Sequence, residues 1–144
     1  MKIVIQIFCL PYEIDELENT LNQLRRASKY INLNEHWIID VCMCTSDDMV
    51  NWPKSSLPKK YFEEKLLKLS WQSDWCDKYF RTSDDIKGCV SHRKTCLEKH
   101  GDSDYFIWLD TDIIFDERTL SYIENASEPV SKITPYTIIT PEFV

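Results

Sequence analysis

Two aspartates, Asp110 and Asp112, stand between two apolar runs in the stretch YFIWLDTDIIF, residues 105–115. Carboxylates this close repel one another unless a cation or a proton lies between them. Carboxylate oxygens suit Mg²⁺ or Mn²⁺, and Mg²⁺ usually takes one or two of them and leaves positions for phosphate oxygens. The pair therefore predicts a metal site that binds a diphosphate. The alternative is a strand that leaves the sheet, with Asp110 as a cap and Asp112 in solvent.

The position of the two acids supports the metal interpretation. In an extended backbone alternate side chains point to the same side, so the spacing predicts that both carboxylates face one way. The apolar residues 113–115 return the chain to the core directly afterwards. We therefore expect the pair at the rim of a sheet.

Two more polar clusters follow apolar, strand-like runs. Pro11, Tyr12 and Glu13 come after the run 2–10, and Ser46-Asp47-Asp48 comes after the run 36–45. In parallel α/β sheets ligands bind beyond the carboxyl ends of the strands, where such clusters meet. The three clusters together predict one binding edge.

The elements that must position these residues alternate along the chain. Apolar runs predict strands, and apolar residues at steps of three or four predict helices. The predicted strands are 2–10, 36–45, 104–110 and 136–144, and the predicted helices are 12–31, 59–69, 89–101 and 116–126. The segment 70–88 is expected to be loop with room for one strand. This order predicts an α/β fold: a mainly parallel, Rossmann-like sheet flanked by helices, in a single domain over residues 1–144.

Composition excludes some classes of function. The net charge is −7, from 17 basic and 24 acidic residues, which argues against a nucleic-acid surface. The apolar run 3–10 is too short to span a membrane, and we expect a cytoplasmic protein with no membrane span. The six cysteines are expected to be free and mostly buried. The histidines at 36, 92 and 100 show no metal-binding spacing, although His92 is a candidate pocket residue.

Three segments in the same order resemble the nucleotide-binding half of a GT-A glycosyltransferase of the family-2-like group. These segments are IFCLPYEIDELENTL, IIDVCMCTSDD and GCVSHRKTCLEKHGDSDYFIWLDTD. The resemblance implies a GT-A-like sheet and a nucleoside diphosphate sugar, with a UDP-sugar favoured, as donor. It also implies Mn²⁺ or Mg²⁺ as cofactor and a glycan, lipid or protein as acceptor.

The resemblance also implies a role for each matched residue. Asp112 ligates the metal, and Asp110 contacts the ribose, the metal or a metal-bound water. The other implied contacts to the donor come from residues before the acidic pair: Pro11, Tyr12, Glu13, Asp47, Asp48, Lys87 and Arg93. Tyr12 and Glu13 would lie against the base and ribose, Asp47 or Asp48 would bind the base, and Arg93 would lie near the diphosphate or the base.

The chain also departs from the family pattern. His92, Lys94 and Cys96 stand where the family usually has a small residue, Asn and Gly, and Ile113 stands where many relatives carry a further Asp. An inverting transferase needs a carboxylate base on the acceptor side. Glu142 and Glu128 are the only late candidates and both are weak, so the catalytic residue is unknown. We therefore expect a domain that is incomplete at its C-terminus, with the donor side present.

Three alternatives compete with the transferase. A haloacid dehalogenase-like phosphohydrolase also ends a strand in Asp-x-Asp, but it wants Thr where this chain has Ile114. A nucleotidyltransferase wants a glycine-rich loop after the first strand, and LPYEIDE has no glycine. The third alternative is a vestigial domain that binds a nucleotide without catalysis.

Overall fold

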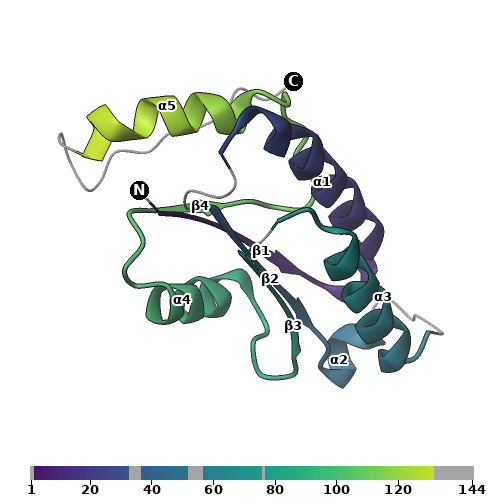
Figure 1. The fold of residues 1–144 in the computed structure, drawn as a ribbon. Helices are drawn as coiled ribbons and strands as arrows, with labels where there is room; N and C mark the ends of the chain where they lie inside the picture. Colours follow the sequence, from purple (N-terminus) through teal and green to yellow (C-terminus); the bar gives the residue numbers. More distant parts are fainter. Residues whose placement is uncertain (1, 33–36, 52–56, 76, 132–144) are drawn as a thin grey trace.

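The structure is a computed structural model that describes residues 2–32, 37–51, 57–75 and 77–131, with side-chain surroundings given up to residue 125. Its centre is a sheet of four parallel strands in the order β3-β2-β1-β4 (Figure 1). The strands are β1 (Ile3–Cys9), β2 (Trp37–Cys44), β3 (Asp77–Ser83) and β4 (Tyr105–Trp108). The predicted α/β class with a parallel, Rossmann-like sheet is confirmed. The predicted strand 136–144 lies outside the described residues.

Helices cover both faces of this sheet. They are α1 (Ile14–Ala27), α2 (Asp47–Val50), α3 (Lys59–Gln72), α4 (Cys89–Lys99) and α5 (Thr119–Ser131), with short 3₁₀ helices η1 (Pro11–Glu13) and η2 (Ser28–Tyr30). Figure 1 shows α4 on one face of the sheet and α1 and α3 on the other. No helix among the described residues is long and apolar enough to cross a membrane.

Two helices begin at residues other than the predicted ones, and local interactions explain the differences. The helix predicted over 12–31 begins at Ile14, because Pro11–Glu13 forms the separate turn η1. The helix predicted to begin at Asp116 begins at Thr119, because Asp116 accepts a hydrogen bond from the Arg118 N–H and forms a turn first. The segment 70–88 holds the end of α3 and all of β3.

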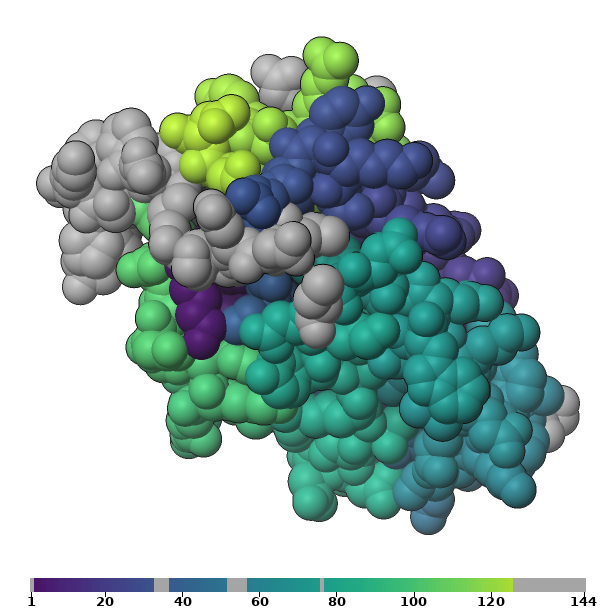
Figure 2. All heavy atoms as spheres, viewed as in Figure 1, coloured from purple at the N-terminus to yellow at the C-terminus, as the bar shows by residue number. Residues whose placement is uncertain are grey.

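The face of the sheet under α1 and α3 is apolar. Alternate residues of β1, including Ile5 and Ile7, meet Leu17 and Leu24 of α1 in one buried cluster. Leu66 of α3 joins the same cluster. In the space-filling view, the side chains of α1 (indigo) and α3 (teal) form an outer layer over this core (Figure 2). Burial of aliphatic side chains at about 25 cal/mol per Å² therefore holds this half of the molecule together.

The face under α4 is different, because it buries polar side chains. Gln6 of β1 pairs in register with Asp40 of β2, and Asp40 pairs with Tyr79 of β3. Both Gln6 and Asp40 are buried. The two residues of α4 that are buried are His92 and Cys96. This helix therefore meets the sheet through polar groups.

The order of the strands creates a switch point between β1 and β4. The connections through α1 and α3 lead from β1 to β2 and then to β3, in one direction across the sheet. The connection through α4 returns across the sheet to β4 on the other side of β1. The chain segments after β1 and β4 leave the sheet side by side at this edge and are hydrogen-bonded to one another. The carboxyl edge at the switch point is where α/β sheets bind ligands.

Candidate functional site

The turn after β1 connects the three polar clusters that the sequence singled out. This turn, η1, contacts α2, which follows β2. On its other side the Glu13 carboxylate accepts a hydrogen bond of 2.9 Å from the Thr111 hydroxyl, which follows β4. The predicted clusters at 11–13, 47–48 and 110–112 thus lie along one edge of the sheet, and η1 is at their centre.

We call Glu13, Asp110, Thr111 and Asp112 the rim site. Glu13 accepts a second hydrogen bond, of 2.9 Å, from the backbone N–H of Leu10. The backbone carbonyl of Thr111 accepts a 2.8 Å hydrogen bond from the Thr20 hydroxyl of α1. Thr111 is buried and held at two atoms, so the position of the loop that carries both aspartates is well defined.

Asp110 and Asp112 are both exposed, one on each side of the buried Thr111. The prediction that they share one side of an extended strand was wrong, because β4 ends at Trp108 and Asp112 lies in a turn. The expected return to the core is confirmed by the buried side chain of Phe115. Neither aspartate forms an ion pair with a described lysine or arginine, so both carboxylates are open to a cation.

The expected base and ribose contacts lie on the β1 and β2 side of the same edge. Tyr12 is about half exposed and Pro11 is buried, so Pro11 shapes the turn while Tyr12 faces outward. Asp47 and Asp48 are exposed in the first turn of α2. Their backbone is held by Ser46, whose carbonyl accepts hydrogen bonds from the next turn.

The two expected cations belong to the connection from β3 to β4, which includes α4. Lys87 is exposed in the loop directly before α4. The guanidinium of Arg93 lies 4.4 Å from the ring centroid of Trp108, the last residue of β4. This cation–π contact holds Arg93 beside the strand that leads into Asp110. The guanidinium of Arg93 is therefore engaged by an aromatic ring two residues before Asp110.

Sequence reasoning missed a further acid at this edge. Asp84 follows β3 and accepts hydrogen bonds from the Thr45 hydroxyl at 3.0 Å and from Lys59 at 2.9 Å. These hydrogen bonds lower the pKa of Asp84 below its usual value. Because its charge is already matched by Lys59, Asp84 is a structural link between β2, β3 and α3.

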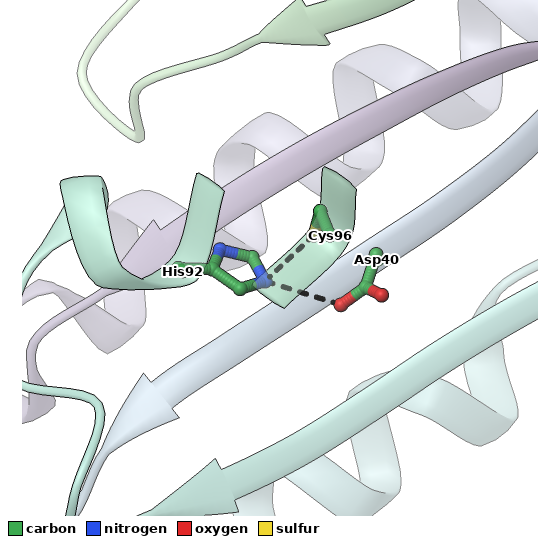
Figure 3. A group of neighbouring side chains, drawn as sticks. All are labelled: Asp40, His92 and Cys96. Carbon is green, nitrogen blue, oxygen red and sulfur yellow. Dashed lines mark hydrogen bonds and ion pairs between the residues drawn. The ribbon is translucent and has the colours of Figure 1, made fainter. Parts of the chain in front are cut away.

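A second polar group lies buried beneath α4 (Figure 3). The Oδ1 atom of Asp40 lies 3.1 Å from His92 Nε2, and His92 Nε2 lies 3.3 Å from Cys96 Sγ. The Oδ2 atom of Asp40 lies 2.9 Å from His100 Nε2. Asp40 is fully buried, and the other three are nearly so. We call Asp40, His92, Cys96 and His100 the buried cluster.

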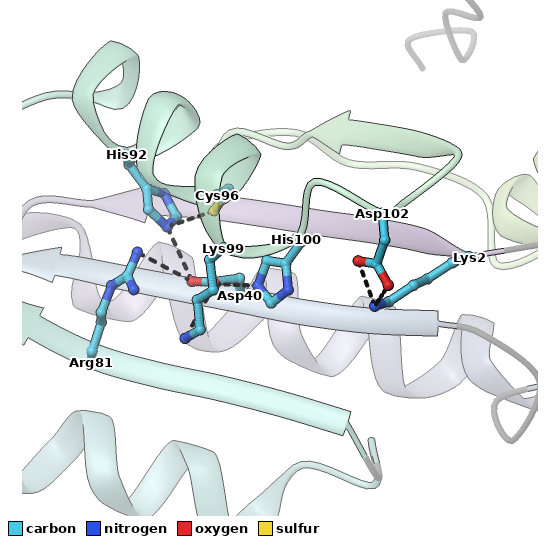
Figure 4. Close-up of polar contacts among 8 residues, drawn as sticks. All are labelled: Lys2, Asp40, Arg81, His92, Cys96, Lys99, His100 and Asp102. Atoms are coloured by element: carbon cyan, nitrogen blue, oxygen red, sulfur yellow. Dashed lines mark hydrogen bonds and ion pairs between the residues drawn. The ribbon is translucent and has the colours of Figure 1, made fainter.

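Two cations border the buried cluster (Figure 4). Arg81 Nη2 lies 3.8 Å from Asp40 Oδ1, and Lys99 Nζ lies 4.0 Å from Asp40 Oδ2. Burial raises the pKa of Asp40, but hydrogen bonds from His92 and His100 and the charge of Arg81 outweigh burial and lower it to about 2. Asp40 is therefore an anion at any physiological pH, inside the protein and away from water.

The sequence contained a signal for this cluster that the prediction passed over. His92, Cys96 and His100 recur at every fourth position, which places them along one face of a helix. Asp40 interrupts the otherwise apolar strand WIIDVCMC. The three histidines by themselves show no metal-binding spacing, as expected from the sequence. The spacing becomes regular once Cys96, between His92 and His100, is included. His36 lies outside the described residues.

Comparisons with known proteins were made at the level of family, of single chains and of fold. The chain matches no protein-family model, no curated protein and no solved structure. The chemistry of the two sites therefore has to be argued from their geometry and their residue types.

Proposed function

We propose that the chain binds a nucleoside diphosphate sugar, with UDP favoured as the nucleotide, at the carboxyl edge of the sheet and acts as the donor-binding part of a GT-A-like glycosyltransferase. One observation carries the proposal. The Glu13–Thr111 hydrogen bond joins the segment after β1 to the Asp110–Asp112 segment at the switch point. Phosphate-bearing ligands bind at such points in α/β sheets.

Different residues of this edge would contact different parts of the nucleotide. Tyr12 offers an exposed ring on which a base can stack, and Asp47 or Asp48 offers an acceptor for base N–H groups. These groups lie on the β1 and β2 side. Asp110 and Asp112 lie on the β4 side, so a nucleotide that spans the edge would place its diphosphate near them.

The rim site fits a divalent cation of the hard, oxygen-binding kind. Asp110 and Asp112 are exposed and make no ion pair with a described cation. They do not form a group of three converging ligands with Glu13, whose carboxylate already accepts two hydrogen bonds. This suits Mg²⁺ or Mn²⁺, which bind one or two carboxylates together with substrate phosphates. The bound cation would supply charge neutralisation for the departing diphosphate.

The charge of the edge makes the metal a requirement. The edge carries the carboxylates of Asp47, Asp48, Asp110 and Asp112, against Lys87 and the stacked Arg93. A diphosphate is itself an anion, and like charges within a few ångströms repel. We therefore expect nucleotide binding to be lost entirely when the divalent cation is removed.

The group that would activate the acceptor is not identified. Glu128 and Glu142, the late carboxylates, lie outside the residues whose side chains are described. The proposal is therefore strongest for donor binding, and transfer to a glycan, lipid or protein acceptor is its further step. A domain that binds the nucleotide without transfer would show the same binding and no turnover.

Isothermal titration calorimetry with UDP and UDP-sugars tests the proposal. We expect binding with Mn²⁺, none with a chelator, and a loss of at least about tenfold in affinity in Asp112→Asn, as for one lost charged contact. Asp102→Asn is the matched control, because it removes the same charge from an exposed aspartate before β4, at the opposite edge.

The outcomes separate the hypotheses. Equal nucleotide affinity in wild type and Asp112→Asn would contradict the rim site as the metal site. Binding of UDP without any divalent cation would contradict the charge argument. Release of UDP from a UDP-sugar in the presence of mixed acceptors would distinguish a transferase from a domain that only binds.

A further inference from the structure

Helix α4 lacks the apolar stripe that attaches the other long helices to the sheet. On α1, five positions are buried, and four of them are aliphatic: Ile14, Leu17, Leu24 and Ala27. On α4 the buried residues are His92 and Cys96, while Val90 and Leu97 are exposed. The apolar residues buried on this face of the sheet, including Val4 and Ile38, come from the strands. The side chains that α4 itself buries are His92 and Cys96, so the buried cluster is what α4 contributes to the attachment.

Three atoms of that cluster converge from two elements. Asp40 presents a carboxylate oxygen from β2, and His92 and Cys96 present Nε2 and Sγ from successive turns of α4. All three atoms lie within 4.8 Å of one another, and among the described residues this is the one group of three or more candidate ligands so arranged. Figure 3 shows one nitrogen of the imidazole facing both of the other side chains.

We propose that Asp40, His92 and Cys96 form a buried site for a zinc-like transition-metal ion that fastens α4 to the sheet. This proposal is independent of the rim site and of the nucleotide. A set of one oxygen, one nitrogen and one sulfur suits zinc, whereas magnesium and calcium prefer oxygen alone. Cross-linking a helix to a strand is the work of a structural metal site.

The separations of the donor atoms agree with tetrahedral coordination. Bonds of about 2.0–2.1 Å to nitrogen and oxygen and about 2.3 Å to sulfur place tetrahedral ligand atoms about 3.3–3.6 Å apart. The observed separations are 3.1 Å from His92 Nε2 to Asp40 Oδ1 and 3.3 Å from His92 Nε2 to Cys96 Sγ. These two separations are about 0.2–0.3 Å shorter than the tetrahedral values, and Asp40 Oδ1 lies within 4.8 Å of Cys96 Sγ.

The surroundings orient the ligands. His100 Nε2 lies 2.9 Å from Asp40 Oδ2, which leaves Oδ1 directed at His92 and Cys96. Carboxylates that bind metals are commonly fixed by such a hydrogen bond from the other side. Burial, together with the charge of Asp40, raises the pKa of the Cys96 thiol to about 12. The thiol is thus protonated in the metal-free protein, and an ion would displace its proton.

Three buried nitrogen atoms beside the site have no hydrogen-bond partner, and an ion bound to the three ligand atoms would not pair them. His92 Nδ1 and two atoms of Arg81, Nε and Nη2, are buried without a hydrogen-bond partner. Such groups cost about 1–3 kcal/mol each when they are left unpaired. Lys99 also opposes a bound cation, since its Nζ lies 4.0 Å from Asp40 Oδ2. Arg81 is closer, with Nη2 3.8 Å from Asp40 Oδ1. Its side chain is 27% exposed, so it can turn toward solvent when an ion binds.

Cobalt(II) titration of the metal-stripped, full-length chain under a phosphine reductant tests the site. Cobalt replaces zinc and reports thiolate ligation by a sulfur-to-cobalt absorption band and tetrahedral geometry by intense visible bands. We expect one cobalt per chain with both signals, and displacement by zinc. The same spectrum is expected in Cys89→Ser, the matched control, because Cys89 is an exposed free cysteine on the same helix.

Cys96→Ser should lose the sulfur-to-cobalt band and bind cobalt at least about tenfold more weakly. A wild-type chain that shows no such band at saturating cobalt would overturn the proposal, whatever the variants do. A band that persists in Cys96→Ser would also overturn it. Circular dichroism of each variant establishes that the variants are folded before their spectra are compared.

Arg81→Gln separates a metal site from a purely hydrogen-bonded cluster. Removing the adjacent positive charge should strengthen cobalt binding by about threefold to tenfold. If the cluster is held only by hydrogen bonds and ion pairs and binds no metal, Arg81→Gln should show no cobalt binding and a lower melting temperature. The second result would contradict the proposal.

Discussion

The rim site and the buried cluster place acidic side chains in opposite surroundings. Asp112 is exposed in a turn, while Asp40 is fully buried in the middle of β2. An exposed carboxylate is stabilised by water and needs no partner, so it is available to a ligand. A buried carboxylate is costly unless charged or hydrogen-bonding groups surround it. We therefore expect the rim to determine binding and the buried cluster to determine stability.

The two regions also differ in the kind of ion they suit. The rim offers oxygen atoms and open positions, which favour Mg²⁺ or Mn²⁺ with a phosphate ligand. The buried cluster adds nitrogen and sulfur, which favour zinc or cobalt. One chain can thus respond to two classes of metal at separate places, with different consequences for ligand binding and for unfolding.

The largest expected difference between the regions is in stability. Asp40→Ala leaves His92, His100 and Arg81 around an empty position, and we expect the free energy of unfolding to fall by about 3–5 kcal/mol. Asp112→Ala removes an exposed carboxylate and should change it by less than about 0.5 kcal/mol. Urea unfolding in a chelator measures both. Similar losses in the two variants would show that the regions do not differ as described.

The pH dependence of the metal-free protein should follow Asp40. Its pKa is about 2 in the folded protein, against a usual value of 3.8. The unfolded chain therefore binds more protons in this range, and the stabilisation is present above pH 3.8 and is lost as the pH falls through about 2. The difference corresponds to about 2 kcal/mol.

Urea unfolding of wild type and Asp40→Asn from neutral pH down to about pH 3 measures this loss. We expect the stability difference between the two proteins to shrink as the pH falls. Asp112→Asn is the control, because it removes an exposed carboxylate that lies outside the buried cluster. A difference between wild type and Asp40→Asn that stays constant with pH would contradict the pKa assigned to Asp40.

A smaller effect is expected from loss of the Thr111–Glu13 hydrogen bond in the rim site. Thr111→Val keeps the volume of the side chain but removes the hydroxyl that donates to Glu13. We expect a loss of about 1–2 kcal/mol in the free energy of unfolding, together with weaker UDP binding. Thr95→Val on α4 is the control, because its hydroxyl bonds only to the carbonyl of Ser91 on the helix surface. Unchanged UDP affinity in Thr111→Val would show that this hydrogen bond does not contribute to UDP binding.

The smallest effect concerns Arg93, which follows His92 on α4 and contacts Trp108 of β4. Arg93→Ala removes the contact with Trp108 and should lower the free energy of unfolding by about 0.5–1 kcal/mol. If Arg93 also faces the diphosphate, UDP affinity falls as well, and it falls more at low salt. Lys94→Ala, at the next and exposed position, is the control. A stability change with no change in UDP affinity would assign Arg93 to packing alone.

Much of the fold could be predicted from local patterns. The runs IVIQIFC and WIIDVCMC are buried on both faces of a parallel sheet, and such strands are nearly continuous in apolar residues. The 3.6-residue period of α1 was equally clear. Strand β3 was harder to predict, because DKYFRTS lies at the edge of the sheet and is only partly buried. Its polar residues resemble a loop.

The two sites differed in predictability for a physical reason. The rim aspartates are two residues apart in sequence and follow a strand, so a local pattern was enough to single them out. In the buried cluster, Asp40 lies 52 residues from His92. A contact of that kind exists only once the order β3-β2-β1-β4 and the placement of α4 over the sheet are known. The local indications were the regular spacing of His92, Cys96 and His100 and a single acid within an apolar strand.

The most direct test of two separate metal sites is to measure Mn²⁺-dependent UDP binding and Co²⁺ binding on the same three proteins: wild type, Asp112→Asn and Cys96→Ser. We expect Asp112→Asn to lose UDP binding and to keep the sulfur-to-cobalt band. We expect Cys96→Ser to lose that band and to keep UDP binding. The account would be contradicted if either folded variant lost both UDP binding and the sulfur-to-cobalt band. It would also be contradicted if both variants kept both properties.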